Sequence, residues 1–155
     1  MMEQDTIDTA LSAGRSGWQR LGAHSIRFEA PDLVFLRVVG DVSPDQLTHL
    51  FAALRRLSSR AGGVCWLIDM THLGEMPLAT RKAARWHGLD GQLHATAMFG
   101  ASLLQRAMAT LTIHAGRLSN RGNGHHKTRF FTSESEARAW LDGVRPTPHQ
   151  LGPTE

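Results

Sequence analysis

An acid, a hydroxyl and an imidazole follow one another closely near the middle of the chain, as Asp69, Thr71 and His72. Such groups form a hydrolytic site when the hydroxyl attacks the substrate as a nucleophile, the imidazole accepts its proton and the carboxylate orients the imidazole. Alternate residues of a strand point to opposite faces, however, and no glycine-serine-glycine loop follows to supply an oxyanion hole. We therefore predict no catalytic residues and no enzyme activity, with Asp69 instead accepting hydrogen bonds from loop amides or capping the following segment.

The adjacent pair His125 and His126 offers two imidazoles, which favour zinc, copper or nickel. A pair alone does not close a metal site, and no Cys, Asp or Glu lies near it in sequence. We interpret this segment as a solvated loop and predict neither a metal nor another cofactor.

The element that must position Asp69 is the apolar run from Val64 to Thr71. Its apolar residues lack helical spacing, which is typical of a strand covered on both faces. In α/β sheets such strands carry ligand or partner sites at their carboxyl ends, so we expect Asp69 to emerge at that rim. Cys65 is the only cysteine, which excludes an internal disulfide, and it is interpreted as a small buried hydrophobe.

The pattern of polar and apolar residues along the rest of the chain predicts a series of strands and helices. Strands are predicted at 25–29, 33–39, 64–71, 95–99 and 127–131, and residues 18–22 could add a short edge strand. Helices are predicted from Ser43 to Gly62, over 78–87, after Ser102, and from Ser133 to Gly143, with 116–126 as a loop. This order predicts an α/β fold: a mixed four- to five-stranded sheet with an N-terminal hairpin, parallel inner strands and about four helices.

Capping signals support two of these helices. Ser43-Pro44-Asp45-Gln46 and Ser133-Glu134-Ser135-Glu136 each place a serine three residues before Gln or Glu, the pattern of a capping box. Gly62-Gly63 and Gly143 are predicted to end the respective helices.

The 155 residues, 41% of them apolar, suit one domain over 18–143, with a flexible leader at 1–17 and a flexible tail at 144–155. The start lacks the pattern of a secretory signal and no apolar run is long enough to cross a bilayer, so we expect a soluble, cytoplasmic protein. The net charge is +3, and no acid lies between Asp90 and Glu134. That interval could attract phosphates, anionic lipid or an acidic protein face, or be a solvated surface.

The strand Leu67-Ile68-Asp69-Met70-Thr71 and the closing unit, Phe130-Phe131 followed by Ala137 and Trp140-Leu141, resemble the STAS superfamily. The resemblance covers roughly residues 22–143 and is nearest to the branch similar to the sporulation anti-anti-sigma factor. It implies a small, often self-associating cytoplasmic α/β domain. The shape is also similar to CRAL-TRIO lipid-transfer domains, which enclose apolar ligands.

Signalling members of this superfamily carry a phosphorylatable Ser at the start of the helix after the central strand. The corresponding segment, 75–80, contains no Ser and offers only Thr80. A phosphate at a helix start would add up to about two negative charges, and this switch needs a hydroxyl there. We predict that the phosphorylation switch is absent.

Our leading hypothesis is a non-enzymatic STAS-like regulatory domain that binds a protein partner or a second copy of itself, not nucleic acid. The binding edge would comprise Asp69, Thr71, His72, Met76, Leu78, Arg81, Arg85 and Trp86.

The alternative is a carrier of a small apolar or anionic-headed, lipid-like ligand. Its site would comprise Met98, Leu104, Arg106, Met108 and Arg117. The stripe formed by Leu104, Met108 and Leu111 with Met98 and Phe99 would then line a pocket, although ordinary core is the simpler interpretation.

Overall fold

The computed structural model describes residues 17–29, 31–85, 93–119 and 127–145. The predicted leader up to residue 16, the tail from residue 146, Trp86, and the pair His125 and His126 lie outside these ranges. The strands are β1 (Gln19–Leu21), β2 (His24–Glu29), β3 (Leu33–Gly40), β4 (Val64–Leu73), β5 (Leu93–Phe99) and β6 (Lys127–Phe131). The helices are α2 (Pro44–Ala61), α3 (Leu78–Arg85), α4 (Leu103–Ser119) and α5 (Glu134–Val144).

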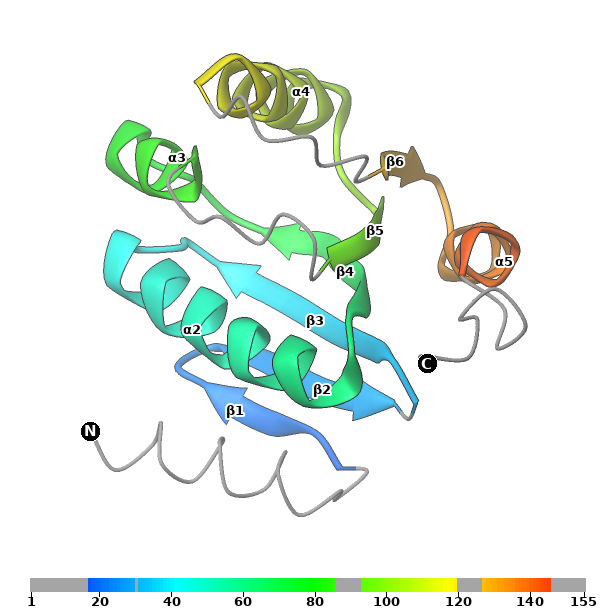
Figure 1. Ribbon diagram of the computed structural model, residues 1–155. Coiled ribbons are helices and arrows are strands. Elements are labelled where there is room, and N and C mark those ends of the chain that lie inside the picture. The colour runs from blue at the N-terminus through cyan, green and yellow to red at the C-terminus, as the bar shows by residue number, and fades with distance from the viewer. Residues whose placement is uncertain (1–16, 30, 86–92, 120–126, 146–155) are drawn as a thin grey trace.

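The six strands form one sheet in the order β1-β2-β3-β4-β5-β6 (Figure 1). β1, β2 and β3 pair antiparallel, whereas β3, β4, β5 and β6 are all parallel. The α/β class, the N-terminal hairpin and the parallel inner strands are thus confirmed. The sheet has six strands rather than four to five, because the short β1 also pairs with β2.

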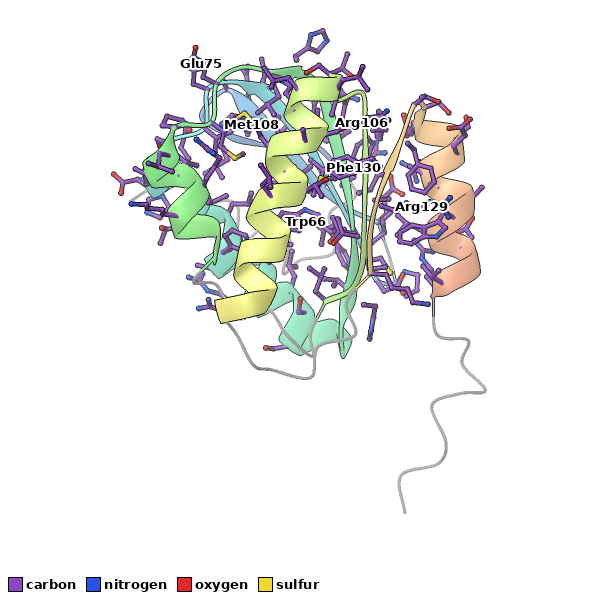
Figure 2. The ribbon with its side chains drawn as sticks, turned by 90° about the horizontal axis from the view of Figure 1, so that it is seen from above. Trp66, Glu75, Arg106, Met108, Arg129 and Phe130 are labelled. Carbon is purple, nitrogen blue, oxygen red and sulfur yellow. The ribbon has the colours of Figure 1, made fainter. Side chains whose placement is uncertain are left out.

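The topology decides which face each helix covers. Each parallel crossover advances one strand in the same direction, and such crossovers are right-handed, so α2, α3 and α4 lie on one face of the sheet. α5 follows the last strand and covers the other face. Figure 2 shows this division, with α3 and α4 on one side of the sheet and α5 on the other.

Each face of the sheet has its own apolar core. Under α2, Leu54 and Val34 are at most 1% exposed, and the ring of Phe51 meets Trp66 edge-on with centroids 5.6 Å apart. Under α5, the core consists of Leu33, Phe35, Cys65, Leu67, Ala95, Ala97, Phe99, Ala137 and Leu141. Alternate residues of β4 supply both cores, which explains its continuous apolar run.

The first helix begins and ends as predicted. The Ser43 hydroxyl accepts from the Gln46 amide at 3.2 Å, and the Gln46 side chain accepts from the Ser43 amide at 3.1 Å, which completes the capping box. Gly62 closes α2 in the left-handed conformation, at φ 74°.

The last helix differs from prediction at both ends. Ser133 accepts from the Glu136 amide, but the Glu136 carboxylate accepts from Thr132 Oγ1 at 2.9 Å, so no reciprocal bond of a capping box is made. Gly143 does not end α5, which continues through Val144, with Arg145 as its C-cap. Arg145 Nε also lies 3.5 Å from Asp32 Oδ1.

Candidate functional site

Asp69 lies within β4 rather than beyond its end, which corrects the prediction that it emerges at the rim. It is 9% exposed and pairs in register with Arg37 of β3 and with Phe99, the last residue of β5. β5 ends at this level, but β4 continues beside β3 as far as Leu73. The strand is therefore longer than its apolar run, because pairing with β3 sustains it after the side chains become polar.

A shift of register accompanies the change from apolar to polar residues. Arg37 pairs with Asp69 but Val39 pairs with His72, so two residues of β4 oppose one residue of β3. This extra residue is a β-bulge, which re-aims the side chains around it. The Thr71 amide and hydroxyl both donate to Asp69 Oδ1, at 2.9 and 2.6 Å.

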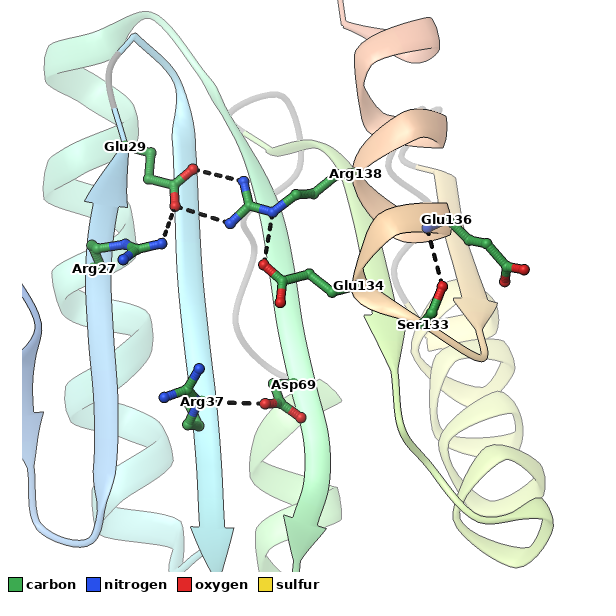
Figure 3. Close-up of polar contacts among 8 residues, drawn as sticks. All are labelled: Arg27, Glu29, Arg37, Asp69, Ser133, Glu134, Glu136 and Arg138. Atoms are coloured by element: carbon green, nitrogen blue, oxygen red, sulfur yellow. Dashed lines mark hydrogen bonds and ion pairs between the residues drawn. The ribbon is translucent and has the colours of Figure 1, made fainter.

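The remaining oxygen of Asp69 faces a cation. Arg37 Nε lies 3.4 Å from Asp69 Oδ2, as Figure 3 shows, and the Arg37 side chain is 43% exposed. The Asp69 carboxylate thus has partners on both oxygens. The expected amide donor is present, but it belongs to Thr71 within β4 and not to a loop.

The loop after β4 is held in place by the turn after β3. Gly74 donates its amide to the Gly40 carbonyl at 2.8 Å, and Asp41 Oδ1 accepts from the Glu75 amide at 2.7 Å. A Cβ on Gly74 would lie 2.4 Å from Asp41 Oδ1, so only glycine fits this close approach. The segment that leads into α3 is therefore fixed in position.

The predicted partner-binding residues on this loop and on α3 differ in burial. Leu78, at the start of α3, is 52% exposed, whereas Met76 is partly buried and packs against the first core. Thr71 and His72 are exposed and Arg81 is half-buried. Arg85 is the last residue of α3, and Trp86 follows it outside the described residues.

The residues of the alternative, ligand-carrying site lie on β5 and α4. Met98 is partly buried against the first core and Met108 is half-buried. Leu104 is 71% exposed, and Arg106 donates from an Nη atom to the Phe131 carbonyl at 3.1 Å. Arg117 lies on α4, which extends to Ser119 and so replaces the first part of the predicted loop 116–126.

The stripe interpreted as ordinary core is only partly core: Phe99 belongs to the second core and Met98 packs against the first, but the leucines of α4 do not. Leu104 and Leu111 are 71% and 69% exposed, although their spacing favoured burial. The first turn is instead anchored by Gln105, whose Nε2 donates to the Leu73 carbonyl at 3.1 Å, and by Arg106. These two anchors turn the polar residues inward and the leucines outward.

The other face of the sheet carries a charged cluster that sequence patterns did not single out (Figure 3). The Glu29 carboxylate receives two hydrogen bonds from Arg138 of α5, at 2.8 and 3.0 Å, and also contacts Arg27. The bonds from Arg138 lower the pKa of Glu29 to about 2 against the opposing effect of partial burial, and the carboxylate in turn raises the pKa of Arg138. Because Glu29 and Arg138 are far apart in sequence, no local spacing could reveal this pair.

Trp18 lies against the same cluster. The guanidinium carbons of Arg27 and Arg37 are each 4.6 Å from its ring, and Phe35 lies 5.0 Å away between centroids. The long arginine stems and the indole together cover part of the sheet that α5 leaves open. We interpret this cluster as structural.

Cys65 is fully buried, and this burial raises the pKa of its thiol, with the Asp32 carboxylate adding to the effect. Such a thiol suits the predicted role as a small apolar residue. Across the described ranges, no three His, Cys, Asp or Glu side chains gather as metal ligands would. Among those same residues, no helix combines the length and the apolar character that crossing a bilayer requires.

The fold, one mixed six-stranded sheet with helices on both faces, places the protein in the α/β class. The model of the SpoIIAA-like family matches residues 33–142, which is most of the chain. The chain therefore belongs to the SpoIIAA-like family, and the resemblance inferred from its residues is confirmed.

Two solved structures share this fold. One is an uncharacterised protein with a SpoIIAA-like fold from Shewanella loihica, which is 24% identical, with 77% of this chain and 92% of that chain covered and a TM-score of 0.51. The other is the anti-sigma factor antagonist SpoIIAA in its unphosphorylated form, at 12% identity, with 79% and 100% coverage and a TM-score of 0.54. No curated protein matches the chain.

Proposed function

We propose that this chain is a non-enzymatic regulatory domain that binds a protein partner, including a second copy of itself, through the edge formed by Met70–Pro77 and α3. The family match and the name of its structural neighbour, an anti-sigma factor antagonist, support a regulatory role. The observation that carries the proposal is Leu78, which is 52% exposed beside a loop that two hydrogen bonds hold rigid. An exposed apolar side chain on a pre-organised edge is suited to anchor a partner.

The environment of Thr80 supports regulation without phosphorylation of this site. Thr80 is 0% exposed, and its hydroxyl donates to the Val42 carbonyl at 2.7 Å. A kinase would have to displace α3 from the turn after β3 to reach this hydroxyl. Incubation with a partner kinase should therefore leave Thr80 unmodified by mass spectrometry, and stoichiometric phosphothreonine at this position would contradict the proposal.

The pairing of Asp69 with Thr71 supports a non-enzymatic role. Both hydrogen bonds from Thr71 go to a carboxylate that also pairs with Arg37, so Asp69 already has partners for both oxygens. Any turnover that depends on Asp69 would overturn this part of the proposal.

Self-association is tested by sedimentation at high protein concentration. Any oligomer of the wild type should dissociate in Leu78→Glu and in Trp86→Ala. Ala139→Glu is the matched control, because Ala139 is exposed on α5, on the opposite face of the sheet. A second test captures partners from a lysate of the protein's own cells, with the same three variants.

A strictly monomeric wild type that also captures no partner sensitive to Leu78→Glu would refute the proposal. Native mass spectrometry of the purified protein distinguishes the proposed interaction domain from the alternative, a ligand carrier. A co-purifying lipid-sized mass would favour the carrier, whereas an empty chain favours the interaction domain.

A further inference from the structure

The most exposed large apolar side chains among the described residues lie on α3 and α4. Leu103, Leu104 and Leu111 of α4 are 84%, 71% and 69% exposed, and Leu78 of α3 is 52% exposed. We call these four residues the leucine surface. Single exposed apolar residues are ordinary, but a group of leucines on neighbouring elements marks an interaction surface.

The orientation of α4 strengthens this interpretation. Gln105 and Arg106, not the leucines, face the sheet, where they donate to the carbonyls of Leu73 and Phe131. Over residues 103–111, α4 thus turns its leucines to solvent, whereas an ordinary surface helix buries its apolar side. Apolar residues turned outward in this way lack a partner within the described part of the chain.

The leucine surface is continuous with the proposed binding edge. α3 and α4 both follow parallel strands, so both helices begin at the same edge of the sheet, and Figure 2 shows them side by side. Gln105 ties the first turn of α4 to Leu73 at the end of β4. Gly100 approaches Thr71 so closely that a Cβ would lie 2.3 Å from Thr71 Oγ1.

The spacing of the exposed apolar residues along α4 favours another helix as the partner of the leucine surface. Leu104, Ala107 and Leu111 are exposed at intervals of three and four residues, the spacing of a coiled-coil seam. A partner helix with leucines at matching positions would fit this seam.

The charge of the two helices favours an acidic partner. On α3, Lys82 is exposed and Arg81 is half-buried, and neither α3 nor α4 contains an acidic residue. Glu75, in the loop before α3, is an exposed acid. A second copy could offer Glu75 from its loop but no carboxylate from α3 or α4, so a contact of helix against helix favours a different protein that carries acidic residues on its own helix.

We infer that the leucine surface binds an acidic amphipathic helix of a protein partner, with leucines on the seam and carboxylates facing Arg81 and Lys82. This inference rests on the proposed function and names the class of partner for that edge. It also extends the edge onto the first turns of α4.

The test measures fluorescence anisotropy of a labelled designed helix of about three heptads, with Leu on its seam and Glu on its flanks, titrated with the full chain. We expect the peptide to bind the wild type, and its affinity to fall at least about tenfold in the double variant Leu104→Gln/Leu111→Gln. Ala139→Gln, on the far face of the sheet, should bind like the wild type. Both leucines are mostly exposed, so circular dichroism should show these variants folded.

A charge exchange tests the second half of the inference. A peptide with Lys in place of Glu should bind the wild type weakly, and Lys82→Glu should reverse the preference between the two peptides. Equal binding of both peptides, or none at millimolar concentration, would overturn the inference.

The same experiments can also identify two other partners of the leucine surface, a membrane or a second copy of the chain. Vesicles of anionic lipid that bind through Leu104 and Leu111 where the acidic peptide does not would identify a membrane surface instead. Self-association lost in the Leu104 and Leu111 variant would identify a second copy. If the peptide fails while Leu78→Glu still abolishes partner capture, the inference fails and the proposed function stands.

Discussion

Glu29 and Arg138 join two elements that the chain separates widely, the hairpin strand β2 and the last helix α5. The unfolded Glu29 carboxyl has a pKa of 4.5, and the folded one has a pKa of about 2. Because folding lowers this pKa, the stabilisation is fully present above about pH 4.5 and is lost as the pH falls towards 2.

Replacing Arg138 should therefore destabilise the protein in a pH-dependent way. We expect Arg138→Met to lower the free energy of unfolding at pH 7 by about 1–2 kcal/mol, less than the full pKa shift implies, because the partly exposed pair is screened by solvent. The difference from wild type should shrink below pH 3, as urea denaturation would show. A double-mutant cycle with Glu29→Gln isolates this pair from the contacts of Arg138 with Glu134 and Phe35, and a difference independent of pH would contradict the assignment.

Asp69 is the second residue whose role can be measured by stability. Its Oδ1 accepts both donors of Thr71, and its Oδ2 faces Arg37. Asp69→Ala should cost about 1–3 kcal/mol, since it leaves these donors without their acceptor. Asp69→Asn keeps one carbonyl oxygen and should cost less. Equal losses in the two variants, measured by thermal unfolding, would show that volume rather than hydrogen bonding matters.

At the scale of elements, glycines decide how closely strands and loops approach. Gly100 ends β5 at φ 79°, and a Cβ there would lie 2.3 Å from Thr71 Oγ1. Gly143 lies inside α5, where a Cβ would meet nothing within 4 Å.

These two glycines give a matched pair of substitutions. Gly100→Ala should destabilise the protein by at least about 1 kcal/mol, because the left-handed conformation disfavours a Cβ and Thr71 must also move. Gly143→Ala should be neutral or stabilising by about 0.5 kcal/mol, because alanine favours the helix. The denaturation midpoints of the two variants measure both changes in stability. If Gly100→Ala leaves the midpoint unchanged, Thr71 moves to accommodate the added Cβ without a cost in stability.

At the scale of the whole molecule, one sheet separates two cores. Leu54 lies at 1% exposure under α2, and Leu141 lies at 1% exposure under α5. Both cores depend on the same strands, since alternate residues of β3 and β4 enter each of them. Loss of packing on either face should therefore destabilise the sheet as a unit.

Leu54→Ala and Leu141→Ala should each lower the free energy of unfolding by about 2–5 kcal/mol. Each variant should still unfold in one transition, and fluorescence and circular dichroism should follow the same denaturation curve. A second transition in either variant would show that the two faces unfold separately, contrary to the prediction of one domain.

Local patterns in the sequence determined the elements of this protein. The capping box at Ser43, the left-handed Gly62 and the apolar run from Val64 each act over a few residues, so the chain alone was enough to predict α2 and β4. The order of strands and helices likewise predicted the mixed sheet, because crossovers between parallel strands have one favoured hand.

Tertiary contacts decided what local spacing could not. The leucines of α4 have the spacing of a buried stripe, but Gln105 and Arg106 bond to carbonyls of β4 and β6 and thereby turn the leucines outward. Asp69 stays inside the sheet because pairing with β3 extends β4 past it. Both outcomes depend on partners more than twenty residues away along the chain. The free energy of these long-range contacts outweighs the weak helix or strand propensity of the local sequence.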